Sequence, residues 1–295
     1  MNTKSHNYVM GASTVTRATL DWVLKKLDEG EIVAIATVIE TSGSVPGKPG
    51  AKLAFSSDGM RFGTVGGAGL ERKVETSLEE LLSQKDFSNK GKIESFMLHK
   101  DGKGLEITKL DSLCGGKVTI SMEVILPMPH LLIVGGGHVG LSIANCCNSL
   151  GWKYSILDVR SEYSDEKRFQ NASELHTSTV KDFLSLQEKD SLARFSDILL
   201  LGHDWKIDQE MLIGILHEYE GDERPRIGAI GSKTKWSSFK KAAMEEGILE
   251  KRLDNVRCPI GIDIGADSPE EIAIAVCAEI IKFEKNKIYE LNIIF

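Results

Sequence analysis

Cysteine is scarce in this chain and follows no pattern. The 295 residues include five cysteines, and no two of them have the Cys-x-x-Cys spacing. An odd number without that spacing predicts neither a disulfide framework nor a zinc ribbon. A reducing cytoplasm is therefore the expected location.

Long apolar runs and an excess of basic residues are also absent. No apolar run approaches the ~18–20 residues of a transmembrane helix, and the N-terminal segment MNTKSHNYVM lacks the apolar core of a signal peptide. The formal net charge is −7, which disfavours nucleic acid or an anionic membrane as the main partner. We expect a globular protein of one large or two ordinary domains, with no membrane and no nucleic acid partner.

A glycine-rich turn lies near the middle of the chain. The apolar residues LLIV end in Gly135-x-Gly137-x-x-Gly140, and a helical pattern follows. This spacing is typical of a Rossmann strand–turn–helix, in which glycine lets the backbone turn, approach a phosphate and pack closely. Asp158 ends the next predicted strand, where an acidic residue accepts a ribose hydroxyl. The pattern predicts a nucleotide-like or other phosphate-bearing ligand, and the alternative is a retained fold whose turn is empty.

Strand and helix patterns alternate after this turn, which predicts a parallel sheet covered by helices. The predicted strands are 130–134, 154–157, 198–201 and 226–230, and the predicted helices are 139–150, 209–219, 234–246 and 269–283. Before the turn, we predict helices at 16–27 and 70–82 and strands at 31–39, 51–55, 62–65, 90–98 and 117–126. Pro127-Met-Pro129 reads as a linker. The fold class is thus α/β, with an N-terminal α+β domain at 1–127 and a Rossmann-like, doubly wound domain at 130–295.

Two glycine-rich segments precede the linker. The loop Gly43–Lys52 can present backbone N–H groups and Lys48 or Lys52 to an anion, or it is a stiff surface turn. Gly66 and Gly67 lead into a predicted helix, so they form either a second anion cradle or a bend needed for tight packing.

Cys114 precedes two glycines in a predicted loop. A cysteine in such a place can act as a thiolate ligand or a sulfur acceptor, whereas an unaligned lone cysteine is more often inert.

Further candidates follow the predicted strands of the second domain. His203 and Asp204 lie at the carboxyl end of a strand, where open α/β sheets bind ligands. Ser232 precedes a helix in a segment that lacks the full Walker spacing. His138 either caps a helix or touches a phosphate, or it is a surface residue. Asp263 is either functional or stabilises a glycine turn.

Taken together, these motifs resemble those of the XdhC/CoxI family across roughly residues 20–285. The matching segments are Gly43–Lys52, Gly63–Glu71, Cys114–Gly116, Gly135–Gly140, His203-Asp204, Gly228–Ser232 and Pro259–Gly265. Two positions depart from the pattern of many relatives. Gly47 stands where they carry arginine, and Gly69 stands where they carry cysteine. Lys48 then offers a point charge instead of a bidentate fork, and Cys114 is left as the main sulfur candidate.

The resemblance implies a maturation factor for molybdenum hydroxylases such as xanthine dehydrogenase or aldehyde oxidoreductase. Such a factor binds the molybdenum cofactor (molybdopterin), supports its sulfuration by a cysteine desulfurase and passes it to the apo-enzyme, commonly as a homodimer. It would be a non-catalytic accessory protein. In this interpretation the Rossmann cleft and the surface formed by Lys48, Lys52, Gly66 and Gly67 bind the cofactor, while Cys114 is a tentative metal ligand.

Two other functions remain open from the residues alone. An NAD(P)-dependent oxidoreductase would use the glycine turn and Asp158, although His203 and Asp204 are the sole proton-transfer candidates that the pattern offers. A scaffold that docks two enzymes with vestigial sites is the third hypothesis.

Overall fold

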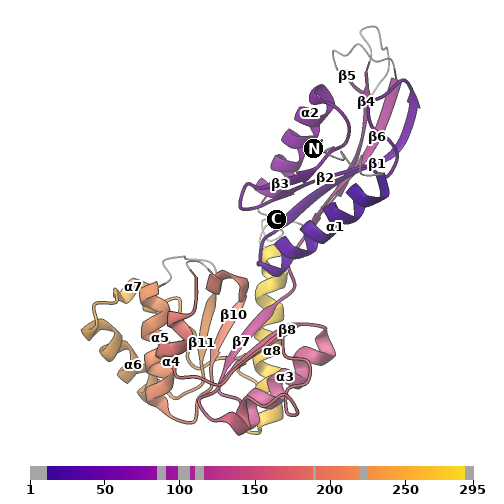
Figure 1. Ribbon diagram of the computed structural model, residues 1–295. Helices are drawn as coiled ribbons and strands as arrows, with labels where there is room; N and C mark the ends of the chain where they lie inside the picture. Colours follow the sequence, from indigo (N-terminus) through magenta and orange to yellow (C-terminus); the bar gives the residue numbers. More distant parts are fainter. Residues whose placement is uncertain are drawn as a thin grey trace, which may run out of the picture. The chain divides into compact units, whose positions relative to one another are not determined.

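The computed structural model describes residues 12–84, 91–98, 107–109, 116–188, 191–218 and 225–289. The chain forms two compact units (Figure 1). Unit 1 comprises Met1–Pro127 with Lys287–Phe295, and unit 2 comprises Met128–Asn286. Within the described ranges, no helix has the length and apolar character needed to cross a membrane.

Unit 1 is an α+β unit built on one six-stranded sheet, in the order β3-β2-β1-β6-β4-β5. All neighbouring strands are antiparallel except β4 and β5, which are parallel. The strands are β1 (Val33–Gly43), β2 (Lys52–Ser56), β3 (Arg61–Gly63), β4 (Gly91–Met97), β5 (Ile107–Lys109) and β6 (Gly116–Ile125). The helices are α1 (Ala12–Asp28) and α2 (Ala68–Ser83).

Strand β1 lies inside this sheet and is buried on both faces. Val33 and Ile35 pack with Val23 of α1, whereas Ala34 and Ala36 join the core that includes Val74 of α2. Successive side chains of a strand point to opposite faces. The uninterrupted apolar run of this strand therefore reflects a sheet covered by a helix on each side.

Unit 2 is a five-stranded parallel sheet in the order β11-β10-β7-β8-β9. Its strands are β7 (His130–Val134), β8 (Lys153–Leu157), β9 (Glu174–His176), β10 (Asp197–Leu200) and β11 (Arg226–Ala229). Its α-helices are α3 (His138–Leu150), α4 (Val180–Ser185), α5 (Trp205–Glu218), α6 (Lys233–Glu245), α7 (Glu250–Leu253) and α8 (Pro269–Tyr289). Two short 3-10 helices are η1 (Ser161–Tyr163) and η2 (Ser191–Arg194).

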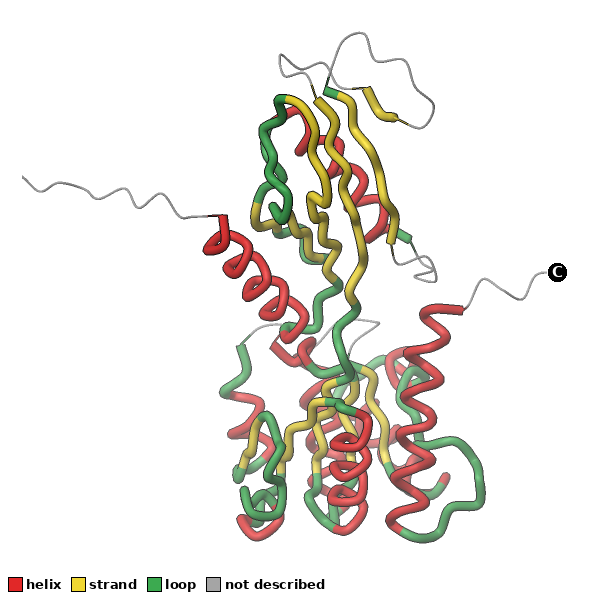
Figure 2. Tube along the Cα trace, turned by 90° about the vertical axis from the view of Figure 1, so that its right-hand side faces the viewer, coloured by secondary structure: helices red, strands yellow, loops and turns green. Residues whose placement is uncertain are grey.

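Helices stand on both faces of this sheet (Figure 2). Leu131 and Ile133 of β7 pack in the core that includes residues of α3 and α8. Leu132 and Val134 pack in the opposite core, with residues of α4 to α7. The expected fold class, an α+β unit followed by a doubly wound Rossmann-like unit, is therefore confirmed.

Most predicted elements are present, with ends that differ by a few residues. The predicted strand at 62–65 is instead Arg61–Gly63, and the helix predicted from residue 209 begins at Trp205. Four short elements carried too little periodicity to be predicted, namely β5, β9, α4 and α7. Strand β9 is the polar triplet Glu-Leu-His, and its pairing with β8 defines it.

A buried ion-pair cluster joins the starts of β10 and β11. Asp197 is fully buried and accepts hydrogen bonds from Arg226 Nε at 3.0 Å and Nη2 at 2.6 Å, and from Arg257 Nη2 at 2.9 Å. Arg257 also contacts Glu279 of α8. Burial raises the pKa of Asp197, but the hydrogen bonds and charges of the two arginines outweigh it and hold this pKa below its ordinary value.

Replacing Asp197 by alanine should lower the free energy of unfolding by about 3–5 kcal/mol, because two guanidinium groups would remain buried without their carboxylate. Urea denaturation at pH 7 measures this loss. The contribution of Asp197 is complete above its unfolded-state pKa and is lost as the pH falls through its lower folded-state pKa. The matched control is Asp254→Ala at the exposed pair with Lys240, which should cost less than about 1 kcal/mol. Equal losses for both variants would contradict the structural role of the cluster.

Candidate functional site

The predicted ligand-binding residues of unit 2 lie at the carboxyl edge of its sheet. From β7 the strand order runs through β8 to β9 on one side and through β10 to β11 on the other. The order therefore reverses between β7 and β10, and open α/β sheets bind ligands outside such a point. A methyl group on Gly135 would lie 2.7 Å from the carbonyl group of Leu201. The loops after β7 and β10 are thus in contact, as the motif positions predict.

The glycine turn is packed tightly at Gly136 and Gly140, as it is at Gly135, and is open at Gly137. A methyl group on Gly140 would overlap the carbonyl oxygen of Gly135, and one on Gly136 would overlap that of Tyr163. Gly137 has no neighbouring atom within 4 Å of the equivalent position. The turn therefore admits a ligand to the backbone at Gly137, while the flanking glycines let helix and loop pack.

Helix α3 begins at this open position. No side chain caps it at Gly137, so its first N–H groups favour an anion. Arg168 donates from Nε to the oxygen of Gly136 at 3.1 Å and from Nη2 to that of Gly137 at 3.3 Å. No carboxylate among the described residues forms an ion pair with Arg168. The turn therefore carries positive charge from both the helix and an arginine.

Asp158 and His138 both lie close to this helix start. Asp158 directly follows β8 and is buried, and its carboxylate accepts a hydrogen bond from the N–H of Gly136 at 2.9 Å. His138 is the first residue of α3 and is exposed. Asp158 is thus part of the turn itself, whereas His138 stands at its rim.

The loops after β10 and β11 hold the other predicted residues. Asp204 accepts a hydrogen bond from the N–H of Lys206 at 2.9 Å, and Ser232 accepts one from the N–H of Lys235 at 3.2 Å as the N-cap of α6. His203 is exposed. Among the described residues, no hydrogen bond links His203 to Asp204. The side chains of Asp204 and Ser232 therefore accept hydrogen bonds from backbone N–H groups at the starts of α5 and α6.

A buried ion pair that the sequence reasoning missed ties these two loops together. Asp208 accepts hydrogen bonds from the N–H of Gly202 at 2.8 Å and from Lys235 Nζ at 2.9 Å. Lys235 Nζ also donates to the oxygen of Ile230 at 3.0 Å. Burial raises the pKa of Asp208, and the lowering effect of Lys235 does not fully offset it. Lys235 stood in the first turn of a predicted helix, whereas Asp208 preceded the helix predicted from residue 209, so no sequence signal indicated that the two residues meet.

Cys258 is a second residue that the sequence reasoning did not weigh. It is half-buried, and its Sγ lies 3.9 Å from the carbonyl oxygen of Gly231. Burial raises the pKa of this thiol, although the charge of Lys235 acts in the opposite direction. The thiol at this edge is therefore protonated at neutral pH.

The segment that contains Asp263 runs along the outer side of β11. Ile260 donates to the oxygen of Ala229 at 3.1 Å, and Ile262 donates to that of Ala275 in α8 at 3.1 Å. Asp263 is exposed. Ser268 and Glu271 form a capping box at the start of α8, with the N–H of Glu271 donating to Ser268 Oγ at 3.2 Å. This segment reaches the carboxyl edge without a described contact to the glycine turn.

The two glycine-rich segments of unit 1 pack against each other. A methyl group on Gly66 would lie within overlap distance of Gly47, and one on Gly47 would overlap the carbonyl oxygen of Val65. Arginine at position 47 would therefore require this backbone contact to open. Lys48 is exposed, while Lys52 Nζ donates to Thr37 Oγ1 at 2.9 Å. Lys48 thus presents its ammonium group on this surface.

Gly67 is the N-cap of α2. Glu71, in the first turn of that helix, accepts a hydrogen bond from Thr64. Its carboxylate opposes the binding of an anion at this helix start.

Cys114 lies outside the described residues. Within the part of the chain that the structure describes, no group of three or more His, Cys, Asp or Glu side chains is arranged to hold a metal ion. The tentative metal role of Cys114 therefore stays a prediction.

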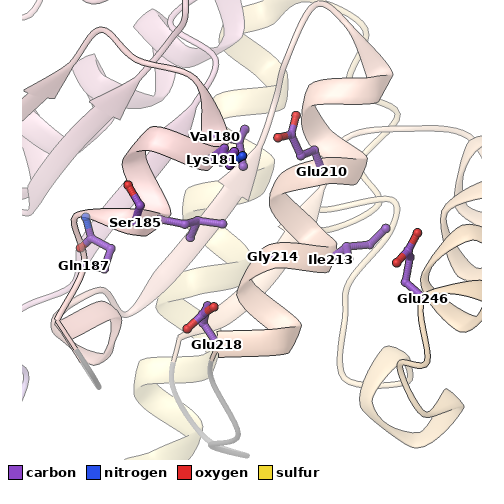
Figure 3. Close-up of a pocket in the computed structure, with 10 residues that line it drawn as sticks. Val180, Lys181, Ser185, Gln187, Glu210, Ile213, Gly214, Glu218 and Glu246 are labelled. Atoms are coloured by element: carbon purple, nitrogen blue, oxygen red, sulfur yellow. The ribbon is translucent and has the colours of Figure 1, made fainter.

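A surface groove of about 590 Å³ lies elsewhere in unit 2, between α4 and α5 (Figure 3). Its lining includes Lys181 and the carboxylates of Glu210, Glu218 and Glu246. None of the residues predicted from the sequence lines it. Because it is acidic, this groove is poorly suited to a phosphate-bearing ligand.

Comparisons with known proteins match both units. The family model described as the XdhC Rossmann domain matches residues 131–280, and the model described as the XdhC and CoxI family matches residues 27–88. The chain is 28% identical over 256 residues to the uncharacterized protein YqeB of Escherichia coli K12, covering 86% of this chain and 44% of that protein. It is 25% identical over 164 residues to a protein of Bacillus subtilis 168 that is named as a probable xanthine dehydrogenase subunit, covering 56% of this chain and 46% of that protein. The chain thus spans about half the length of these curated relatives.

Solved structures also resemble the chain. A crystal structure described as a xanthine dehydrogenase from Bacillus halodurans has 18% identity and a TM-score of 0.46, covering 91% of this chain and 96% of that one. An imine reductase from Myxococcus stipitatus in complex with NAD+ has 13% identity and a TM-score of 0.31, covering 55% of this chain and 62% of that one.

Alanine substitutions at two adjacent glycines should separate packing from ligand access. Gly136→Ala should lower the free energy of unfolding by about 2–3 kcal/mol, because its methyl group meets the carbonyl of Tyr163. Gly137→Ala should cost less than about 1 kcal/mol, since the position is open. Urea denaturation of both variants checks the difference, and equal destabilisation would contradict the described turn.

Proposed function

Because the chain belongs to the XdhC and CoxI family, we propose that it is a maturation factor for a molybdenum hydroxylase of the xanthine dehydrogenase or aldehyde oxidoreductase type. It binds the molybdenum cofactor, supports its sulfuration and inserts it into the apo-enzyme. The observation that carries this proposal is that family models match both units of the chain. The Bacillus subtilis relative, named for xanthine dehydrogenase, supports the same client class.

The turn at the start of α3 is the proposed site for the phosphate of the pterin. Three features support it: an uncapped helix start, the open position at Gly137 and the charge of Arg168. A phosphate gains from helix N–H groups and from a nearby cation. Because the protein must release the cofactor to the apo-enzyme, binding has to be reversible. Binding through one solvent-accessible phosphate contact is compatible with such release.

Unit 1 is proposed to bind the cofactor through Lys48 and through the paired glycine segments at Gly47 and Gly66. The exposed ammonium of Lys48 is a flexible point charge. Cys114 is proposed, on the sequence resemblance alone, to protect the metal centre or to receive sulfur for it. The partners are a cysteine desulfurase, the apo-hydroxylase and a second copy of the chain in a homodimer in the cytoplasm. The protein itself acts as an accessory factor and not as a catalyst.

The NAD(P)-dependent oxidoreductase remains the second candidate, because the glycine turn and the position of Asp158 favour it. Against it, Asp204 bonds its own helix start and shares no hydrogen bond with His203 in the described structure. His203 and Asp204 therefore do not form a hydrogen-bonded pair that could transfer a proton beside a nicotinamide.

Purification from cells that synthesise the cofactor tests the proposal. The full chain should carry pterin and molybdenum in near-equal amounts, measured by fluorescence of the oxidised pterin and by elemental analysis. Gly137→Ala should reduce this loading at least about tenfold, because its methyl group blocks close approach of the phosphate. Protein from cells that cannot make the cofactor is the blank. Absence of pterin from the wild-type protein would refute the proposal.

Cys114→Ala should weaken retention of molybdenum while leaving the free energy of unfolding nearly unchanged. The matched control is Cys146→Ala, which replaces a half-buried cysteine on α3 and should retain wild-type molybdenum loading. Both variants are compared by the molybdenum that survives gel filtration, and by the activity that they restore to a xanthine dehydrogenase apo-enzyme. Equal molybdenum retention in Cys114→Ala and Cys146→Ala would contradict the proposed role of the Cys114 sulfur.

A further inference from the structure

Each oxygen of the Asp158 carboxylate accepts two hydrogen bonds from donors within the chain. Its Oδ2 accepts hydrogen bonds from the N–H of Gly136 at 2.9 Å and from Arg160 Nη2 at 2.8 Å. Its Oδ1 accepts from the N–H of Arg160 at 3.0 Å and from Arg160 Nε at 2.9 Å. Only 3% of the side chain is exposed. In a dinucleotide-binding Rossmann fold, the acidic residue at this position accepts a ribose hydroxyl instead.

Arg160 is held in place from two sides. Its guanidinium forms a bidentate pair with Asp158, and its central carbon lies 3.8 Å from the centre of the Tyr163 ring. Bidentate pairing and stacking on an aromatic face both restrict an arginine side chain. Burial raises the pKa of Asp158, and the bonds from Arg160 and Gly136 more than offset this effect and lower it. The carboxylate is therefore ionised and committed to its partners.

The segment that follows Arg160 packs against the glycine turn. The carbonyl of Tyr163 packs on Gly136, and Arg168 donates to the oxygens of Gly136 and Gly137. The groups around Asp158 thus occupy the directions from which a ribose would approach it. Gly137, at the start of α3, stays open.

We propose that Arg160 is a specificity-determining residue, which closes the ribose position of this Rossmann unit against NAD(H) and NADP(H). The site then takes a ligand that places a terminal phosphate at Gly137 and has no adenosine half. The edge of Arg160 formed by Nε and Nη2 faces Asp158, so that edge is not available for the 2′-phosphate of NADP(H) either. That the phosphate belongs to a pterin rests on the proposed function, whereas closure of the ribose position does not.

Titration of the full chain with NADH and NADPH, followed by nucleotide fluorescence, tests the closure. Wild-type protein should bind neither with a Kd below about 1 mM. Arg160→Ala removes the two side-chain hydrogen bonds to the carboxylate of Asp158 and leaves the two backbone ones. It should raise the affinity for NADH at least about tenfold, because a larger fraction of molecules is competent to bind. NADPH should gain less, because its 2′-phosphate would face the freed carboxylate.

Two further variants make the result specific to the pair. Adding Asp158→Ala to Arg160→Ala should abolish the gain for NADH, since the gain needs the carboxylate. Arg160→Lys keeps the positive charge but loses the bidentate guanidinium geometry, so it should give a smaller gain in NADH affinity. This variant also tests the proposal if Arg160→Ala does not fold. Lys167→Ala changes an exposed side chain of the same segment and should leave binding unchanged.

Pterin loading measured on the same samples separates the two proposals. Wild-type protein that carries pterin and also binds NADH at micromolar concentration overturns the closure and leaves the maturation role standing. Protein without pterin whose Arg160→Ala variant gains NADH affinity supports the closure and overturns the maturation role. If none of the Arg160 variants gains affinity, Arg160 is not the closing residue and the closure proposal is wrong.

Discussion

The hydrogen bond from the N–H of Gly136 to the buried carboxylate of Asp158 is the contact on which the site of unit 2 depends. It joins the loop after β7 to the end of β8, and so holds the start of α3 against the sheet. No side chain fits at Gly136 or Gly140 without a shift of the neighbouring backbone. The same bond takes up part of the carboxylate that a ribose would need. The same arrangement therefore packs the turn and occupies the carboxylate of Asp158.

Buried ion pairs hold both ends of the sheet around that turn. Asp197 binds two arginines at the amino ends of β10 and β11, and the pair of Asp208 and Lys235 joins the loops at their carboxyl ends. Apolar side chains fill the space between on both faces. A buried ion pair stabilises little in itself but is costly to break. Such pairs therefore suit the task of fixing the loops that line a site.

In unit 1 a tightly packed glycine stands beside an exposed lysine. The backbone of Gly47 lies against Val65 and Gly66, so a larger side chain at this position would not fit without a shift of that backbone. The neighbouring Lys48 supplies an exposed positive charge, although a lysine does not reproduce the bidentate geometry of arginine. This surface therefore keeps an exposed positive charge at Lys48.

The sequence alone determined the fold class, the strand–turn–helix at Gly135 and the N-cap of α8 at Ser268, because periodicity, glycine spacing and capping are local properties of the chain. Short polar elements such as β9 were missed, since pairing with a neighbouring strand defines them. Only the tertiary structure decided that Arg160 and Gly136 bind Asp158, and that Lys235 reaches Asp208 from another helix. Spacing predicts where a carboxylate stands, but the partner it binds depends on which donors the fold brings within hydrogen-bonding distance, and those donors come from other segments of the chain.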